Sequence, residues 1–132
     1  MKSIFTKQIQ DLTPYLYIGK ISELTGASRK AIRLYEERGL IPKPARKGNY
    51  RIYSDQDAFL IHMIKTAQSV GFSLAEIKGL VEHKVKDRTF PLKKAEELCN
   101  KKRVSLRNEI EAIHALEKRL DKLQEMMNQT FG

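Results

Sequence analysis

The last third of the chain has an apolar residue at every seventh position between residues 92 and 127. This spacing predicts one amphipathic helix over about residues 91–127, which at roughly 1.5 Å per residue would be about 55 Å long. A helix of that length cannot bury its apolar side against the smaller domain before it, so the repeat predicts a coiled coil with a second copy of the chain. Lys102 and Glu109 interrupt the seam, which indicates that the pairing is not a uniform two-stranded zipper. The predicted seam residues are Leu92, Cys99, Leu106, Ile110, Ile113, Leu116, Leu120, Leu123 and Met127.

Positive charge is concentrated ahead of this helix. Residues 28–51 contain eight Lys or Arg side chains and two Glu. The whole chain has a formal net charge of +9, and residues 1–88 hold 16 basic against 9 acidic side chains. Such an excess favours an anionic partner, of which nucleic acid is the commonest. The alternative is a basic surface that is only solvated.

Two short helices joined by a tight turn are predicted near the start. The first covers residues 18–25 and is ended by Gly26, which adopts a left-handed backbone at low cost. Ser28 then caps a second helix, which Gly39 ends. The pair predicts a helix-turn-helix, although on spacing alone many helical hairpins would fit the same pattern.

The segments that follow make this prediction stronger. A turn signal at residues 47–49 predicts a small β-hairpin, or wing, over residues 44–53. Ser54 caps a helix from residue 55 to about residue 70, and a capping box opens another over residues 74–83. The apolar stripe predicted for the first of these two helices is Phe59, Leu60, Met63, Ile64 and Ala67.

These elements define a mainly α fold in three parts. We expect an N-terminal leader over residues 1–14, either a short helix or a mobile arm. A winged helix-turn-helix domain follows over residues 15–88. A long dimerisation helix over residues 89–132 completes the chain.

The composition argues against several classes of protein. The single cysteine cannot form an intrachain disulfide or a multi-thiolate metal site. No apolar run approaches the roughly 18 residues of a membrane span and no signal peptide pattern is present, so we expect a cytoplasmic protein. No nucleophile–base pair, glycine-rich phosphate loop or metal-ligand set is visible, so we expect no enzyme, no metal and no cofactor.

Four segments occur in a characteristic order, namely IGKISELTG at 18–26, KAIRLYEERGL at 30–40, NYRIY at 49–53 and VGFSLAEI at 70–77. Together they resemble the MerR family of bacterial transcription regulators over residues 17–83. The resemblance implies a winged helix-turn-helix and a homodimer formed by antiparallel packing of the long helices. It further implies a palindromic promoter site whose spacer DNA the dimer distorts, with RNA polymerase as a partner.

The basic helix and wing then acquire expected roles on double-stranded DNA. Arg29 and Lys30 are candidates for base edges in the major groove, and either could hold a phosphate instead. Arg33 and Tyr35 match the family pattern and should contact the DNA backbone, although Tyr35 could belong to the core. The full DNA-binding set is Ser28, Arg29, Lys30, Arg33, Tyr35, Arg46, Lys47, Tyr50 and Arg51.

Within the wing, Arg46, Lys47 and Arg51 are expected phosphate ligands. Tyr50 either contacts the sugar–phosphate backbone or packs the wing onto the domain. The family commonly has Gly-Tyr-Arg here, whereas this chain has Asn49 before the tyrosine. Asn tolerates a left-handed backbone well, so the turn should form.

No effector can be assigned from the residues. Metal-sensing members of the family are expected to carry cysteines near the start of the long helix and after its end, and Leu92 stands near the first of these places. Cys99 is predicted to be a buried seam residue. The alternative for Cys99 is a redox or electrophile sensor.

Two other functions fit parts of the pattern. An excisionase-like or architectural protein would use the same winged domain to bend DNA without an effector. A coiled-coil adaptor with no role on DNA would explain the long helix and leave the basic segment unused.

Overall fold

The computed structural model describes residues 16–87 and 90–132, with side-chain surroundings for residues 16–82 and 90–132. The chain divides between Phe90 and Pro91 into two compact units. The predicted leader lies outside the described residues, as does the predicted boundary at residues 88–89.

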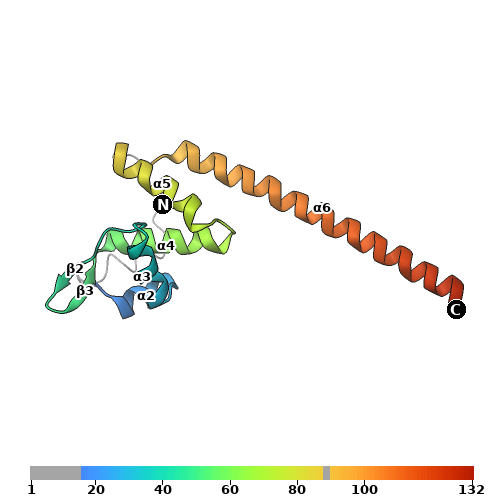
Figure 1. The fold of residues 1–132 in the computed structure, drawn as a ribbon, viewed down its shortest axis with the longest axis horizontal. Coiled ribbons are helices and arrows are strands. Elements are labelled where there is room, and N and C mark those ends of the chain that lie inside the picture. Colours follow the sequence, from blue (N-terminus) through green and yellow to red (C-terminus); the bar gives the residue numbers. More distant parts are fainter. Residues whose placement is uncertain (1–15, 88–89) are drawn as a thin grey trace. The chain divides into compact units, whose positions relative to one another are not determined.

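The first unit combines short helices with a small sheet (Figure 1). Its hairpin extends from the group of helices in that view. The predicted helix-turn-helix, wing and two further helices are all present. In chain order the elements are β1 (Leu16–Tyr17), α2 (Ile18–Thr25), α3 (Arg29–Glu37), β2 (Ala45–Lys47), β3 (Tyr50–Tyr53), α4 (Asp55–Ser69) and α5 (Leu74–Asp87).

The turn between α2 and α3 forms as its residues predict. Gly26 ends α2 with a φ of 75°, and its N–H donates to the Ser22 carbonyl at 3.0 Å. Ser28 begins α3 by accepting a hydrogen bond from the Ala31 N–H at 3.0 Å. These two bonds satisfy backbone groups at the end of α2 and at the start of α3. The turn between the helices is therefore defined by its own residues.

The sheet has three strands in the order β1-β3-β2, and both pairings are antiparallel. The hairpin turn contains Gly48 with a φ of 63°, which suits the tight connection of β2 and β3. Strand β1 was not predicted, because two residues are too few to show an alternating pattern. Its pairing of Leu16 with Tyr53 ties the start of the domain to the wing.

Both later helices begin at reciprocal caps. The Ser54 hydroxyl accepts from the Asp57 N–H at 3.1 Å, and the Asp57 carboxylate accepts from the Ser54 N–H at 3.0 Å. Ser73 and Glu76 form the same pair of bonds at the start of α5, both at 3.1 Å. Helix α5 continues to Asp87, beyond the predicted end at residue 83.

One hydrophobic core holds the unit together. It includes Ile21 of α2, Ile32 of α3 and Tyr53 of β3, all with almost no exposed surface. The stripe predicted for α4 was partly wrong, since Ala58, Ile61 and Ile64 are the buried residues and Met63 is 52% exposed. Helix α4 is apolar around much of its circumference, so its packing against α2 and α5 decides which row faces inward.

The second unit is the single helix α6 (Leu92–Phe131). The predicted long helix is confirmed and runs to residue 131 rather than 127. Its 40 residues correspond to about 60 Å. Along Leu92–Phe131, all of which the structure describes, no residue is buried in the single chain.

Replacing Ser54 with Ala should lower the stability of the first unit. The substitution removes one bond of the capping box and loosens the other, at a cost of about 1 kcal/mol. For a domain of this size we expect the melting temperature to fall by about 4–8 °C in circular dichroism. Gln56→Ala, an exposed change in the same turn, is the control, and an equal loss in both variants would contradict the role of the cap.

Candidate nucleic-acid interface

Helix α3 separates its apolar and basic residues onto different faces. Ile32 and Tyr35 are buried, while Arg29, Lys30 and Arg33 are exposed. A shallow hollow follows the exposed face, and its lining comprises Ser28, Lys30, Ala31, Arg33, Leu34 and Glu37. A helix with this arrangement can enter a DNA groove while its other face remains in the core.

Tyr35 is in the core and does not reach the surface. It is 1% exposed, and its hydroxyl donates to Oε1 of Gln68 on α4. Burial raises the pKa of this tyrosine above its usual value, because the charged form would lose its hydration. The predicted DNA contact is therefore wrong, and the alternative of a core residue is confirmed.

The wing presents basic and aromatic side chains. Arg46 and Lys47 on β2 are exposed, and Tyr50 on β3 is 70% exposed. The Tyr50 ring meets the ring of Tyr17 edge to face, with centroids 6.2 Å apart. This aromatic contact links the tip of the wing to β1.

Arg51 is turned differently from the other wing cations. Its Nε lies 3.2 Å from Oε2 of Glu36 on α3. The contact is an ion pair rather than a well-aligned hydrogen bond, since neither atom has a hydrogen-bond partner among the described residues. The side chain predicted to hold a phosphate is thus engaged inside the protein.

The hydroxyl of Tyr53 is also buried without a hydrogen-bond partner in the described part of the chain. The pKa of Tyr53 is raised, first by burial and then by the negative charges of Glu36 and Asp57. The positive charges of Arg51 and Arg33 lower it in part. The hydroxyl of Tyr53 therefore lies within the electrostatic influence of charged side chains from α3, the wing and the start of α4.

Arg29 lies against helix α2. A Cβ atom added to Gly19 would lie 2.9 Å from Nη2 of Arg29. Because Gly19 has no side chain, the guanidinium of Arg29 can lie against α2 at this point. In this structure the arginine predicted to reach base edges rests on the neighbouring helix.

Four contributors to this interface were not predicted from the sequence. They are Tyr17, Gly19, Glu36 and Gln68. Each acts through a residue from another element, so no local spacing identifies it. For Tyr17 the one available signal is an aromatic residue directly before a predicted helix.

The predicted seam residues of α6 are exposed in the single chain. Leu106, Ile113, Leu120 and Met127 each have between 45% and 63% of their surface accessible. Cys99 is exposed as well. An apolar row of this length is typical of an interface between helices, so the single chain leaves the predicted seam open to a partner.

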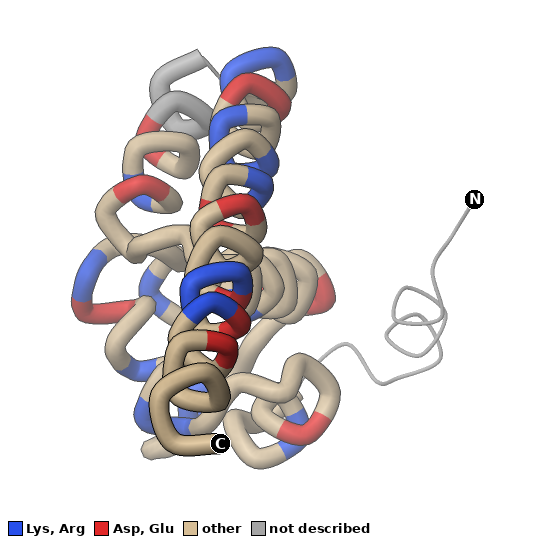
Figure 2. The backbone as a smooth tube through the Cα atoms, turned by 90° about the vertical axis from the view of Figure 1, so that its right-hand side faces the viewer, with Lys and Arg blue, Asp and Glu red and all other residues tan. Residues whose placement is uncertain are grey.

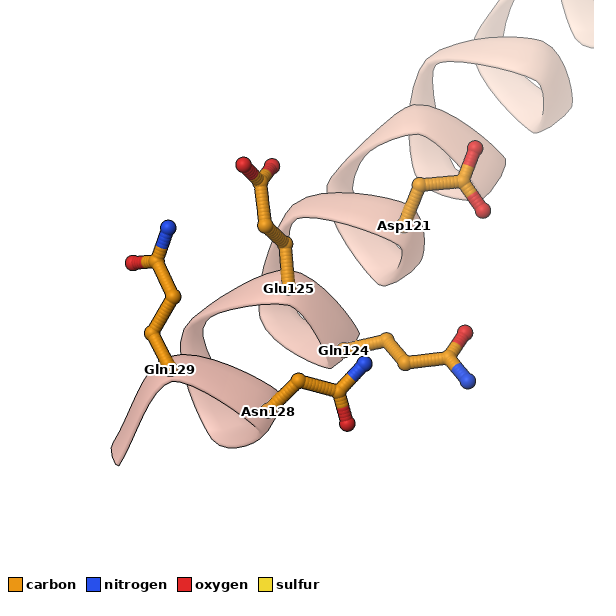
Figure 3. A pocket seen from close by; sticks show the side chains of 5 residues that line it. All are labelled: Asp121, Gln124, Glu125, Asn128 and Gln129. Carbon is orange, nitrogen blue, oxygen red and sulfur yellow. The ribbon is translucent and has the colours of Figure 1, made fainter. Parts of the chain in front are cut away.

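Most of the remaining circumference of α6 is polar, although Val104 and Met126 are exposed apolar residues outside the predicted seam. Basic and acidic residues alternate along the helix in Figure 2. Near its end the polar side chains point away from the helix in Figure 3, where Asp121, Gln124, Glu125, Asn128 and Gln129 border a shallow depression. The contrast between the two sides indicates which one can pair with another helix.

Two further properties of the described residues bear on function. No group of three or more His, Cys, Asp or Glu side chains there could hold a metal ion. No helix in those same segments is long and apolar enough to cross a membrane.

The chain matches two family models. Residues 16–84 match the MerR HTH family regulatory protein, and residues 60–123 match the model described as MerR, DNA binding. The chain belongs to the MerR family of helix-turn-helix regulatory proteins. It is therefore a DNA-binding transcription regulator and not an enzyme, as predicted, and a homodimer that distorts promoter DNA fits this family.

Curated relatives support this assignment. The HTH-type transcriptional regulator CueR of Escherichia coli O157:H7 is 33% identical over 116 residues, which cover 87% of this chain and 78% of that protein. The mercuric resistance operon regulatory protein of Bacillus cereus is 43% identical over 65 residues. That match covers 48% of this chain and 49% of the relative, or about half of each.

Solved structures have the same fold. The transcription regulator PbrR691 from Ralstonia metallidurans CH34, in complex with lead(II), gives a TM-score of 0.65 at 26% identity, covering 83% of this chain and 86% of that one. HiNmlR, a MerR family regulator lacking the sensor domain and bound to promoter DNA, gives a TM-score of 0.61 at 22% identity. It covers 81% of this chain and 79% of its own, and supports the fold alone.

Gly19→Ala should test the position of Arg29. Alanine is favoured over glycine in a helix by about 0.5–1 kcal/mol, but here its Cβ would push the guanidinium away. We expect the substitution to stabilise the domain more in an Arg29→Ala background than in the natural chain, as measured by urea unfolding. Equal gains in the two backgrounds would mean that Arg29 does not rest against α2.

Proposed function

We propose that two copies of this chain bind a palindromic promoter site and distort the DNA between its halves. The observation that carries the proposal is the exposed basic face of α3 beside a basic wing, on a domain of the MerR family. One helix for the groove and one hairpin for the phosphates match the two kinds of contact that a duplex offers.

Individual residues would divide this work. Lys30, and Arg29 once it leaves α2, would meet base edges at the N-terminal end of α3. Arg33, Arg46 and Lys47 would bind phosphates, and Tyr50 would pack on the sugar–phosphate backbone. Ser28 would lie at the same helix end, where backbone N–H groups favour an anion.

The second copy would cover the open side of α6. The proposed interface follows the predicted seam from Leu92 to Met127, including Cys99, and the two helices would run antiparallel. A two-fold dimer presents the same DNA-binding domain twice. Its preferred site would therefore be a palindrome, and α6 would set the spacing of the two half-sites. The three-part division into leader, DNA-binding domain and dimerisation helix is part of this proposal.

Other parts of the proposal rest on the family. RNA polymerase would be the partner at the target promoter, and the protein would act in the cytoplasm, where that promoter lies. Bending and untwisting the spacer costs several kcal/mol, so a switch would need a ligand that prefers the distorting state by a comparable amount. No such ligand is assigned.

DNA binding can be tested by selecting bound fragments from genomic DNA and footprinting the best of them. We expect one short palindromic protected site within a promoter. The double variant Arg33→Ala with Arg46→Ala should flatten the dependence of log affinity on log salt by about 0.9 for each phosphate that is no longer neutralised. A phased array of sites, or no protection even at low salt, would overturn the proposal.

Dimerisation can be tested with a charge placed on each side of α6. Leu116→Lys should dissociate the dimer, because two buried leucines are removed, each worth about 1.5–3 kcal/mol. We expect a dissociation constant more than about a hundredfold higher in analytical ultracentrifugation. Gln129→Lys adds the same charge on the polar side shown in Figure 3 and should leave the dimer intact. A natural chain that sediments as a monomer at micromolar concentration would exclude the proposed assembly.

A further inference from the structure

The ion pair between Glu36 and Arg51 joins the two elements proposed to touch DNA. Glu36 belongs to α3 and Arg51 to β3, and the pair closes at 3.2 Å. Its members are not ordinary surface charges, because the side chains are only 14% and 31% exposed. A pair in such surroundings is screened little by salt and resists separation more than an exposed one.

Strand alternation places Arg51 on the inner face of the wing. Successive residues of a strand point to opposite faces, so Arg51 shares its face with Tyr53, which is 1% exposed. Tyr50, at 70% exposed, belongs to the opposite face with Ile52. The register also pairs Arg46 with Arg51, so both arginines lie on this face, and the contact with Glu36 is what directs Arg51 toward α3.

A carboxylate on a helix that approaches DNA needs a physical reason. Glu36 would repel phosphates if its charge were free, and its burial without a partner would be costly. Pairing with Arg51 offsets part of both penalties and at the same time joins the wing to α3. Tyr53 supports the same placement, because the negative charge of Glu36 raises its pKa and the positive charge of Arg51 lowers it.

We propose that Glu36 is a positioning residue for DNA binding, which clamps the wing to α3 through Arg51 and keeps that guanidinium off the phosphates. Arg51 then stabilises the position of the wing, and Arg46 and Lys47 make the phosphate contacts of the wing. This inference rests on the proposed DNA interface and assigns a different role to one of its cations.

The test compares Glu36→Gln, Arg51→Gln and the double variant with the natural chain in DNA-binding titrations over a range of salt concentrations. Each single change should weaken binding by about tenfold, and the double variant should bind no more weakly than either single one. Arg51→Gln should leave the salt slope unchanged. Arg46→Gln, by contrast, should reduce it by about 0.9 for each phosphate that the arginine neutralises in the natural complex.

Glu37→Gln is the matched control. It removes the same charge from the next position of α3, where the side chain is exposed. Loss of this repulsion should leave DNA binding equal or slightly tighter. If Glu36→Gln also tightened binding, or if Arg51→Gln flattened the salt slope as Arg46→Gln does, Arg51 would be a phosphate ligand and the inference would be wrong.

A measurement on the natural chain avoids any effect of the substitutions on folding. The Nε–Hε signals of Arg51 and Arg46 can be followed by NMR as duplex is added. We expect the Arg46 signal to shift and the Arg51 signal to stay in place, and the reverse would overturn the inference. A natural chain that bound no duplex would instead refute the proposed function.

Discussion

The burial of one side of α3 is the constraint on which the interface depends. A helix of nine residues is too short to be stable alone in water, so its shape comes from packing. Ile32 and Tyr35 supply that packing, and the bond from the Tyr35 hydroxyl to Gln68 ties the helix to α4. Once these two side chains are buried, the helix can no longer rotate, and Arg29, Lys30 and Arg33 remain on its exposed face.

The wing depends on a second set of contacts. Leu16 pairs with Tyr53, Tyr17 meets Tyr50, and Arg51 reaches Glu36. A two-stranded hairpin is only marginally stable alone, so these contacts with β1 and α3 are needed to hold its direction. They also give the cations of the wing unequal roles, because one is engaged internally while Arg46 remains exposed.

Helix α6, unlike α3 and the wing, is not stabilised by burial within its own chain. No residue of α6 is buried within its own chain, and its apolar row gains stability only against another surface. The first unit is thus stabilised within one chain, whereas the apolar row of α6 would be stabilised by a partner, and under the proposed function that pairing would set the spacing of the two DNA-binding domains.

The sequence by itself determined the elements that rest on local chemistry. Gly26, Ser28, Ser54 and Ser73 act on backbone within a few residues, so the helix starts and the turn were predictable, as was the long helix from its repeat. Only the tertiary structure decided that Tyr35 is buried, that Ile61 rather than Met63 faces inward and that Arg51 turns to Glu36. Those outcomes depend on which surfaces distant segments bring together, because an amphipathic tyrosine or an arginine fits either environment until its neighbours are in place.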